Sequence, residues 1–322
     1  MLTSVEHIVG VDRLLARVAG TAHDVLQLAP GILDARLHYL KVDGLEIGGG
    51  EVNLPLRAQG RTVEHLATIT LRLDCPGGGL VNGRRVGTGS VVVWRPGATY
   101  DGVAPAGDRW VTVLVPWDEL PRRPGIARRG ASWRWRTSLL LTELRPDEAD
   151  IARALSERTR TLAHERPDRV PATVAAELRA RWLELVGALF ARAVPTPAPR
   201  GATWSATLDV RAADRYLRSH LGATIYLADV SRATGVPPRT LQAAFRHVLG
   251  CSPMAYLETL RLHAALRALR TPGGAVPETV REVAARFGFR HYPRFSAAFR
   301  ARFVARPGAI LRAARAGRAE AP

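Results

Sequence analysis

The sequence LADVSRATGVPPRTLQAAFRHVLGCSP (residues 227–253) is followed by a second version of the same pattern, VREVAARFGFRHYPRFSAAFRARFVARP (residues 280–307). In each version a short amphipathic segment ends at a glycine, Gly235 or Gly288, and a tight turn leads into a second segment with an apolar residue at every fourth position. That spacing predicts helices, and glycine suits the left-handed backbone that ends a helix. Each version therefore predicts a helix-turn-helix.

The second helix of each unit carries a short apolar row. These residues are Leu241, Phe245 and Leu249 in the first unit and Phe295, Phe299 and Phe303 in the second. Between the units, residues 252–269 have apolar residues at three- and four-residue spacings, with Ser252 as the N-cap and Pro253 at the first helical position. One long helix is predicted there. It would join the units rigidly, so that both second helices could face one side of a duplex.

This segment resembles the DNA-binding domain of AraC/XylS-type transcription regulators over residues 211–313. The residues that carry the resemblance are Leu227, Ala228, Gly235, Arg239, Thr240, Leu241, Phe245, Gly250, Ser252, Pro253, Tyr256, Leu257, Arg261, Leu262, Ala264, Ala265, Val283, Ala284, Phe287, Gly288, Phe289, Phe295, Ser296, Phe299, Phe303 and Pro307. Val304 departs from the family, in which glycine often follows the last recognition helix. Ala243 and Ala297 also stand where other members often carry arginine.

Seven side chains of the second helices are candidates for DNA contact. In a helix-turn-helix the second helix enters the major groove with its early exposed residues near base edges. Arg239 could bind guanine O6 and N7 and Gln242 adenine N6 and N7, whereas Arg246, one turn later, is better placed for phosphate. The candidates of the second unit are His291, Tyr292, Arg294 and Arg300. Two units on one helix are expected to meet adjacent major grooves, about 34 Å apart, in double-stranded DNA.

The charge distribution agrees with a polyanionic partner. The 322 residues carry a formal charge of +17. Residues 201–322 hold 19 arginines against 7 acidic residues, a net +12. The excess positive charge thus lies mostly in the segment with the helix-turn-helix pattern, as a phosphate-binding surface requires.

Cysteine and histidine usage argues against a metal or disulfide scaffold. Cys75 and Cys251 fall in different predicted domains, and only His38 and His65 lie in the strand-rich region, without H-x-H spacing. No metal and no cofactor are expected. The chain has no run of 18 apolar residues and no basic-then-apolar leader, so a soluble cytoplasmic protein without a membrane partner is expected.

The period of the pattern differs in the first half of the chain. Residues 5–29 are predicted to form a helix or a loose N-terminal arm, with Val11, Leu14, Leu15 and Val18 on one face. From Gly31 onward, short β-rich runs alternate with Gly- and Pro-containing turns, which predicts an antiparallel β-barrel or jelly roll. The runs are ARLHYLKVDGLEIGGGEVNL (35–54), HLATITLRLDC (65–75), GSVVVWRP (89–96) and RWVTVLVPW (109–117).

Residues 87–103, GTGSVVVWRPGATYDGV, resemble the turn-strand-turn of cupin-like barrels, which form the sensor domain of many AraC-type regulators. A small barrel is either filled by side chains or holds one small ligand. Aromatic and cationic residues that could line a pocket for a carboxylate or a planar molecule are Arg57, Trp94, Arg95, Tyr100 and Trp110. The alternative is that the tryptophans are core residues and the arginines are solvated.

Two helices are predicted after the strands, over residues 144–165 and 173–194. The second has one apolar face, formed by Leu178, Trp182, Leu185, Leu189 and Phe190. In AraC-type proteins helices placed in this way commonly pair two subunits, so the resemblance implies that Leu178, Trp182, Leu185 and Leu189 form a homodimer contact. The alternative is packing of this face against the chain's own barrel.

The predicted fold is therefore α+β and multidomain. The expected parts are a β-barrel sensor-like domain (1–143), a helical dimerisation or linker region (144–194), a proline-rich linker (195–206), an all-α DNA-binding domain (207–315) and a disordered tail (316–322). Within the DNA-binding domain we expect helix-turn-helix units at 224–249 and 278–303 and a linker helix at 252–269.

The resemblance implies a sequence-specific, effector-responsive transcription regulator that is not an enzyme. It also implies contact with RNA polymerase during activation, although repression is compatible with the same residues. Two alternatives remain. One is a ligand-independent DNA-binding protein with a solidly packed barrel, and the other is an enzyme barrel fused to a DNA-binding domain, for which the sequence offers neither a metal set nor a reactive cysteine in a recognisable context.

Overall fold

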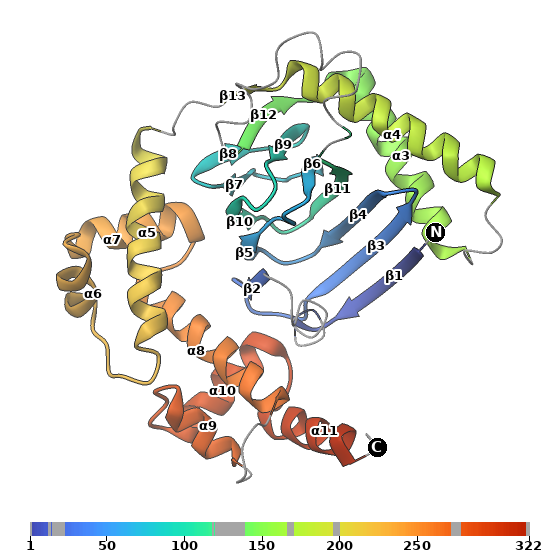
Figure 1. Cartoon of the computed structure of the whole chain (residues 1–322). Helices are drawn as coiled ribbons and strands as arrows, with labels where there is room; N and C mark the ends of the chain where they lie inside the picture. Colours follow the sequence, from blue (N-terminus) through green and yellow to red (C-terminus); the bar gives the residue numbers. More distant parts are fainter. Residues whose placement is uncertain are drawn as a thin grey trace.

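The computed structural model describes residues 2–11, 14, 23–117, 119, 139–165, 171–195, 200–271 and 278–319. Two antiparallel sheets form the centre of the molecule (Figure 1). Helices α3 and α4 lie on one side of the sheets, and the helices from α5 to α11 lie on the other side and below. The predicted combination of a strand-rich first part and an all-helical last part is confirmed.

The larger sheet has the strand order β1-β3-β4-β11-β6-β9-β12-β13, with antiparallel neighbours throughout. Its strands are β1 (Leu2–Val9), β3 (Asp34–Val42), β4 (Leu45–Val52), β6 (Leu66–Asp74), β9 (Ser90–Trp94), β11 (Asp108–Pro116), β12 (Leu139–Glu143) and β13 (Val194–Pro195). The strands predicted from the four β-rich runs are all present.

The smaller sheet has the order β2-β5-β10-β7-β8. Its strands are β2 (His23–Gln27), β5 (Leu56–Arg61), β7 (Gly79–Val81), β8 (Arg84–Val86) and β10 (Thr99–Ala104). The predicted antiparallel strand region is present, but its two sheets share no strand and do not close into a barrel. Period-2 patterning specifies strands but not closure, because closure depends on pairing between strands that are distant in sequence.

Helices α3 (Pro146–His164) and α4 (Ala172–Arg192) cover one face of the larger sheet. The side chains of β6 show why the helices cover this face. Ile69 and Leu71 point into the apolar core beneath the helices, whereas Thr68 and Arg72 point to the opposite face of the sheet. Trp182 is fully buried in this core, and its indole nitrogen donates a hydrogen bond to the Thr159 hydroxyl at 3.0 Å.

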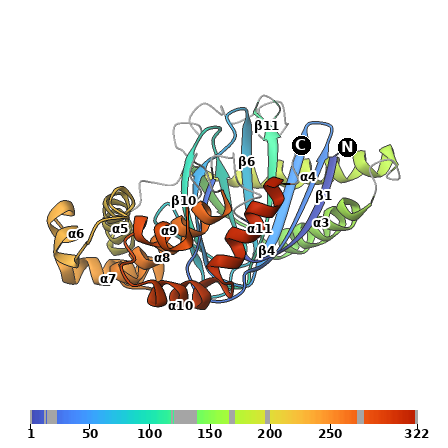
Figure 2. The same cartoon turned by 90° about the horizontal axis from the view of Figure 1, so that it is seen from below.

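The helical part contains two helix-turn-helix units and three further helices. Its elements are α5 (Ala202–Ser219), α6 (Leu227–Thr234), α7 (Pro238–Leu249), α8 (Pro253–Arg270), α9 (Val280–Arg286), α10 (Tyr292–Phe303) and α11 (Pro307–Ala319). Helix α8 lies between the units, and seen from below α7 and α10 lie along the same edge of the molecule (Figures 1 and 2). The Ser252 side chain accepts a hydrogen bond from the Ala255 amide and caps α8 as predicted.

The prediction of a helix or a loose arm over residues 5–29 was wrong for both ends of this segment. Residues 2–9 form strand β1, which pairs with β3 over its whole length, and residues 23–27 form β2. Val11 and Leu14 are buried, whereas Leu15 and Val18 lie outside the described residues. The residues before Val11 pair with β3, a contact that local pattern does not report. Val11 and Leu14 themselves are helical, as their spacing predicted.

Two boundaries differ from those predicted. Residues 194–195 form β13 and α5 begins at Ala202, so both ends of the proposed linker (195–206) belong to regular elements. At the other end α11 extends to Ala319, which places residues 316–319 of the proposed disordered tail in a helix. The alanine-rich sequence of this segment has high helix propensity, which the prediction underweighted.

The hydrophobic cores of the two helix-turn-helix units both continue into the sheets. Val25, Leu33 and Leu56 pack in the cluster that contains Phe295 and Phe299. The cluster of the first unit likewise includes Leu26 and Leu80 from the smaller sheet. Sheets and helices thus share their buried apolar surface.

Candidate functional site

The first helix-turn-helix unit is built on a left-handed turn. Gly235 ends α6 with φ 71°, a conformation that costs a residue with a side chain about 1–2 kcal/mol. Helix α7 then begins at Pro238 and buries Leu241 and Phe245 completely. Its opposite side leaves Arg239 and Arg246 exposed and Gln242 half-buried.

The second unit repeats this geometry with a longer turn. Gly288 follows α9 with φ 80°, and a Cβ there would lie 3.0 Å from the Leu221 carbonyl oxygen. Both the backbone conformation and the available space therefore require glycine. Helix α10 buries Phe295 and Phe299 completely and leaves Arg294 and Arg300 exposed.

His291 and Tyr292 have intramolecular partners. His291 is the N-cap of α10, and its Nδ1 accepts a hydrogen bond from the Arg294 amide at 3.3 Å. The half-buried Tyr292 ring lies 6.2 Å from the Phe295 ring and 5.5 Å from the Arg281 guanidinium carbon. These contacts position the start of α10, so the two residues have a structural role whether or not they touch DNA.

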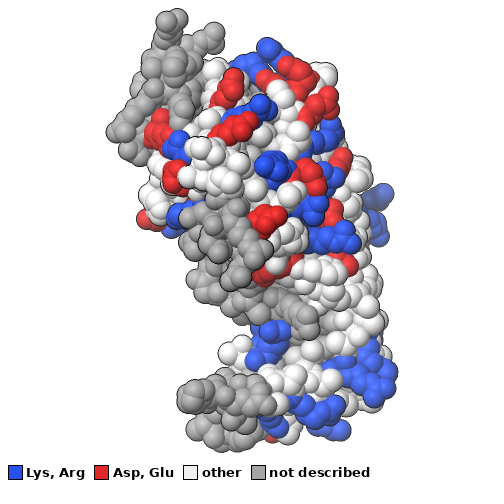
Figure 3. Space-filling view, turned by 90° about the vertical axis from the view of Figure 1, so that its right-hand side faces the viewer, with Lys and Arg blue, Asp and Glu red and all other residues white. Residues whose placement is uncertain are grey.

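The exposed arginines of α7 and α10 differ from those that face the sheets. Arg239, Arg246, Arg294 and Arg300 form no ion pair with any carboxylate that the structure describes. Residues 278–319 contain ten arginines and two glutamates, Glu278 and Glu282. On the face shown in Figure 3 the lower part of the molecule is correspondingly basic, whereas the upper part mixes both charges. The outer faces of both second helices therefore present uncompensated positive charge.

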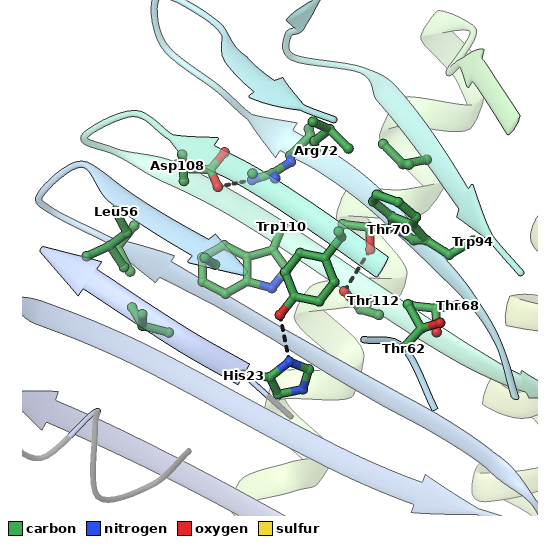
Figure 4. A pocket seen from close by; sticks show the side chains of 18 of the residues that line it. His23, Leu56, Thr62, Thr68, Thr70, Arg72, Trp94, Asp108, Trp110 and Thr112 are labelled. Atoms are coloured by element: carbon green, nitrogen blue, oxygen red, sulfur yellow. Dashed lines mark hydrogen bonds and ion pairs between the residues drawn. The ribbon is translucent and has the colours of Figure 1, made fainter. Parts of the chain in front are cut away.

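A cavity of about 430 Å³ lies between the two sheets (Figure 4). Three of the five residues proposed from the sequence for an effector pocket, Trp94, Tyr100 and Trp110, line it. Arg57 and Arg95 do not line it, because Arg57 points to the helical part and Arg95 is exposed. Arg95 directly follows the end of β9 at Trp94.

The polar lining of the cavity was missed by the sequence analysis. It consists of His23, Thr62, Thr68, Thr70, Arg72, Asp108 and Thr112. Along β6, polar residues alternate with buried apolar ones: these are Thr68, Thr70 and Arg72. Because both faces of this strand are buried, the alternation could have predicted a cavity with a polar lining. Burial lowers the pKa of His23, and the Tyr100 hydroxyl lies 2.6 Å from its Nδ1.

A buried polar network joins the smaller sheet to the helical part. Arg57 on β5 donates to Asp101 at 3.0 and 2.9 Å and to the Tyr256 hydroxyl at 2.5 Å. Tyr256 donates to Asp214 on α5 at 2.8 Å, and Arg211 on α5 donates to Asp101 at 3.1 Å. Burial alone would raise the pKa of Asp101, but hydrogen bonds and charge from Arg57, and then from Arg211, lower it.

Strand β2 makes a second set of contacts. Asp24 accepts from Arg218 on α5 at 2.7 Å and from Arg267 on α8 at 3.0 Å. The backbone amide of Gln27 donates to Nε2 of His263 at 3.1 Å, and this histidine is completely buried. Burial, followed by the charge of Arg267, lowers the pKa of His263 to about 3, so the imidazole is neutral at pH 7.

The C-terminal end of α10 is also held by the sheets. Arg302 donates to the Leu28 carbonyl oxygen at 2.6 Å. Its own carbonyl oxygen accepts from the Gln27 side chain at 3.1 Å and from the Gly31 amide at 3.2 Å. The sheets thus contact α5, α8 and α10, and both helix-turn-helix units lie against them.

Strands β2, β5 and β10 separate the cavity from the helices, and their side chains alternate between the two. The cavity side carries His23, Val25, Leu56, Ala58, Tyr100 and Gly102. The helical side carries Asp24, Leu26, Arg57, Gln59, Asp101 and Val103. A single layer of backbone therefore lies between any molecule in the cavity and the contacts that hold α5 and α8.

The residues proposed for dimerisation lie inside the protomer. Leu178, Trp182, Leu185 and Leu189 are at most 5% exposed and pack in the core between α4 and the larger sheet. This arrangement is the alternative that the sequence left open, in which the apolar face covers the chain's own strands.

Neither a metal centre nor a membrane span is found in the described parts of the chain. No group of three His, Cys, Asp or Glu side chains among them could hold a metal ion. None of the described helices combines the length and the apolarity that a bilayer span requires.

Comparison with known proteins identifies the helical part. A helix-turn-helix domain family matches residues 230–313. The probable thc operon regulatory protein of Rhodococcus erythropolis is 37% identical over 103 residues, which are 32% of this chain and 31% of that protein. The chain thus matches about a third of that curated relative's length.

Two solved structures extend the comparison. A probable AraC family transcriptional regulator from Rhodopseudomonas palustris is 30% identical, with a TM-score of 0.31, and the match covers 33% of this chain and 97% of that one. The AraC-like transcriptional activator CuxR is 15% identical, with a TM-score of 0.40, and the match covers 82% of this chain and 96% of that one.

Proposed function

We propose that the protein is an AraC-type, sequence-specific DNA-binding regulator of transcription that responds to a small molecule, since residues 230–313 match a helix-turn-helix domain family. The observation that carries this proposal is the pair of second helices, α7 and α10, each with exposed arginines that have no carboxylate partner among the described residues. Such side chains are available for phosphates and base edges.

Within this interface each candidate has a distinct expected role. We expect Arg239, next to the N-terminus of α7, to contact a guanine edge and Arg246, two turns later, to contact phosphate. Gln242 is half-buried and would reach only an adjacent base. In α10, Arg300 lies in the register of Arg246 and is the proposed phosphate contact. Pro293 lies in the register of Arg239, and Arg294, one residue later, is the proposed base contact, while His291 and Tyr292 hold the helix start.

The response to a small molecule rests on the alternation along β2, β5 and β10. A ligand in the cavity would change DNA affinity only through a difference in its own affinity for two arrangements of sheets and helices. The contacts of Asp24, Arg57 and Asp101 with α5 and α8 are the ones that would differ between those arrangements. RNA polymerase remains the partner that activation would require.

A homodimer, if it forms, has to use another surface than the one first proposed. The apolar face of α4 is occupied by the larger sheet. Exposed apolar side chains elsewhere include Ile151 on α3 and Leu208 on α5, which are 47% and 45% exposed. Sedimentation velocity of the full chain, free and with its selected duplex, would give the subunit number.

The proposal is tested by selecting bound sequences from a random duplex pool with the purified full-length chain at near-physiological salt. We expect one motif whose two conserved blocks are separated by about one helical turn. The double variant Arg239→Ala/Arg294→Ala should lose both blocks, whereas Arg158→Ala, which removes an exposed arginine from α3, should keep them. Absence of an enriched motif, or the same motif with the double variant, would refute sequence reading by these helices.

A further inference from the structure

The described lining of the cavity between the sheets carries no net charge at pH 7. Its ionisable residues are His23, Arg72, Tyr100 and Asp108. Arg72 and Asp108 form an ion pair with each other. Burial lowers the pKa of His23 and raises the pKa of Tyr100 to about 12, so both side chains are uncharged. An ionic ligand would therefore lose its hydration without gaining an unpaired counter-charge, which is costly in such surroundings.

Two threonine hydroxyls lie side by side on the cavity face of the larger sheet. Thr70 on β6 pairs with Thr112 on β11, and their side-chain oxygens are 3.2 Å apart (Figure 4). Only one of the two hydroxyls can donate in this hydrogen bond, and the other keeps a hydrogen for which the described part of the chain offers no acceptor. Both side chains line the cavity and retain part of their surface, whereas their neighbours Ile69 and Val113 are completely buried. The hydroxyl pair thus offers a donor to the cavity.

The other polar side chains of the described lining are engaged, out of reach, or donors as well. The Thr62 hydroxyl donates to a backbone carbonyl oxygen and accepts from a backbone amide, both at 2.9 Å. The hydroxyl of Thr68 is buried so completely that a ligand in the cavity does not touch it. The Tyr100 hydroxyl is engaged with Nδ1 of His23. Arg72, on the same face of β6, can only donate. An acceptor is therefore the polar group of a ligand that this lining fits.

Aromatic surfaces flank the hydroxyl pair. Trp110 lies two residues before Thr112 on the same face of β11, about 7 Å along the strand. Trp94 comes from β9, and its ring lies 6.0 Å from the Tyr100 ring. Figure 4 shows the hydroxyl pair between the two indoles. A volume of about 430 Å³ corresponds to roughly 14 water-sized groups at about 30 Å³ each. An apolar lining with few fixed polar groups is typical of small-molecule sites.

We propose that the cavity binds an uncharged, planar and largely apolar molecule of this size through a carbonyl oxygen that accepts a hydrogen bond from the Thr70–Thr112 hydroxyl pair. Of the two ligand classes considered from the sequence, this favours the planar molecule over the carboxylate. Its role as an effector rests on the regulatory function proposed above. Its binding does not, because no residue of α5 to α11 is among the described lining residues.

Three probes of one shape test the proposal by equilibrium dialysis of the full chain without DNA: 2-acetylnaphthalene, 2-isopropenylnaphthalene and 2-naphthoate. The group on the ring offers a neutral acceptor in the first, no acceptor in the second and a charged acceptor in the third. We expect the ketone to bind at least about fivefold more tightly than the alkene, the effect of one hydrogen bond, and the carboxylate to bind most weakly. Equal binding of the ketone and the alkene, tightest binding of the carboxylate, or no binding of any probe would each overturn the proposal.

Variants of nearly unchanged volume locate the preference. Thr70→Val/Thr112→Val removes both hydroxyls, so the ketone and the alkene should bind within about twofold of each other. Continued binding of the alkene shows that this variant is folded and that its cavity is intact. Thr68→Val is the matched control, since Thr68 lies two residues away on the same face of β6 with its hydroxyl out of a ligand's reach, and it should keep the preference. A preference that survives in the double variant, or is lost in the control, would exclude the hydroxyl pair as its source.

The carbonyl stretch of bound 2-acetylnaphthalene gives a second, independent readout. A hydrogen bond to the carbonyl oxygen lowers its stretching frequency, so infrared difference spectra should show a lower frequency in the wild type than in Thr70→Val/Thr112→Val. Thr70→Ser/Thr112→Ser keeps the hydroxyls and should behave like the wild type. Equal frequencies in the wild type and the valine variant would contradict the proposed contact. Since none of these measurements involves DNA, their failure leaves the DNA-binding proposal untouched.

Discussion

At the scale of the residue, the most conspicuous local feature is Val304, which ends α10 in the left-handed conformation with φ 52° and ψ 27°. A β-branched residue is an outlier in this region because its Cβ substituents crowd the backbone. The side chain is 57% exposed and contributes little packing. The position therefore has a backbone conformation that favours glycine. This agrees with the family resemblance, in which glycine often stands at this position.

Replacing this residue should stabilise the protein. Val304→Gly removes the strain at a cost in unfolded-state entropy, and we expect the free energy of unfolding to rise by about 1 kcal/mol in urea denaturation. Val304→Ala, which keeps Cβ, should gain less. A lower stability for the glycine variant than for the wild type would show that the exposed valine contributes more than its backbone costs.

His263 gives stability a pH dependence. Its pKa is about 6.5 in the unfolded chain and about 3 when buried, so the unfolded chain binds more protons in that window. Stability is therefore fully present above pH 6.5 and is lost as the pH falls. Between pH 7.5 and 5.5 this histidine alone should cost about 1.4 kcal/mol.

Urea unfolding at both pH values checks this expectation. His263→Gln keeps an acceptor for the Gln27 amide but does not titrate, so it should lose about 1.4 kcal/mol less than the wild type between pH 7.5 and 5.5. His38, whose pKa burial lowers to about 4, titrates in both proteins and cancels in the difference. Equal losses in the two proteins would mean that the pKa of His263 does not change on folding.

At the scale of the element, the helix-turn-helix units were predictable because their signals are local. Capping residues, glycines and four-residue apolar spacing all lie within the segments that they specify. The sheets were predictable only as strands. Arg72 and Asp108 are 36 residues apart and meet only because β6 pairs with β11. The sequence placed Arg57 in the cavity, whereas its side chain lies on the opposite face of β5. Both faces of this strand are buried, so the alternation of side chains indicates two faces but not which of them lines the cavity.

The position of a side chain along α7 determines the expected effect of removing it. Arg239→Ala should weaken binding to the preferred duplex by about 1–3 kcal/mol and relax the preference at one base pair. Arg246→Ala should weaken all duplexes about equally and reduce the slope of log affinity against log salt by about 1. Fluorescence anisotropy on the selected duplex and its single-base variants separates the two outcomes. Identical effects of both substitutions would contradict the assignment of base and phosphate roles.

At the scale of the whole molecule, sheets and helices share buried apolar surface and a buried ion network, so we expect them to unfold together. Arg57 is 1% exposed, and its partners Asp101 and Asp214 are 12% and 6% exposed. Arg57→Met removes the bidentate partner of Asp101 and one of the two arginine partners of Asp214. We expect this variant to lose about 3–5 kcal/mol and to show two calorimetric transitions where the wild type shows one. Arg160→Met, at a pair that is about half exposed, should cost less than about 1 kcal/mol.

The shared core also explains why the arrangement of parts could not be predicted. The proline-rich stretch after α4 suggested a linker between independent domains, yet Leu26 of the smaller sheet packs in the cluster of the first helix-turn-helix unit and the Gln27 backbone amide donates to His263. Contacts of this kind join residues more than 150 positions apart, and no local pattern reports them. A wild type that unfolds in two separate calorimetric steps would contradict this cooperative description.

The most direct test of the proposed function is a hydroxyl-radical footprint of the full chain on its selected duplex. If α7 and α10 read adjacent major grooves, two protected patches should appear on one face of the DNA, about 10–10.5 base pairs apart, and Arg239→Ala and Arg294→Ala should each weaken a different patch. A single patch, or two patches that weaken together whichever arginine is removed, would contradict recognition by two separate helix-turn-helix units.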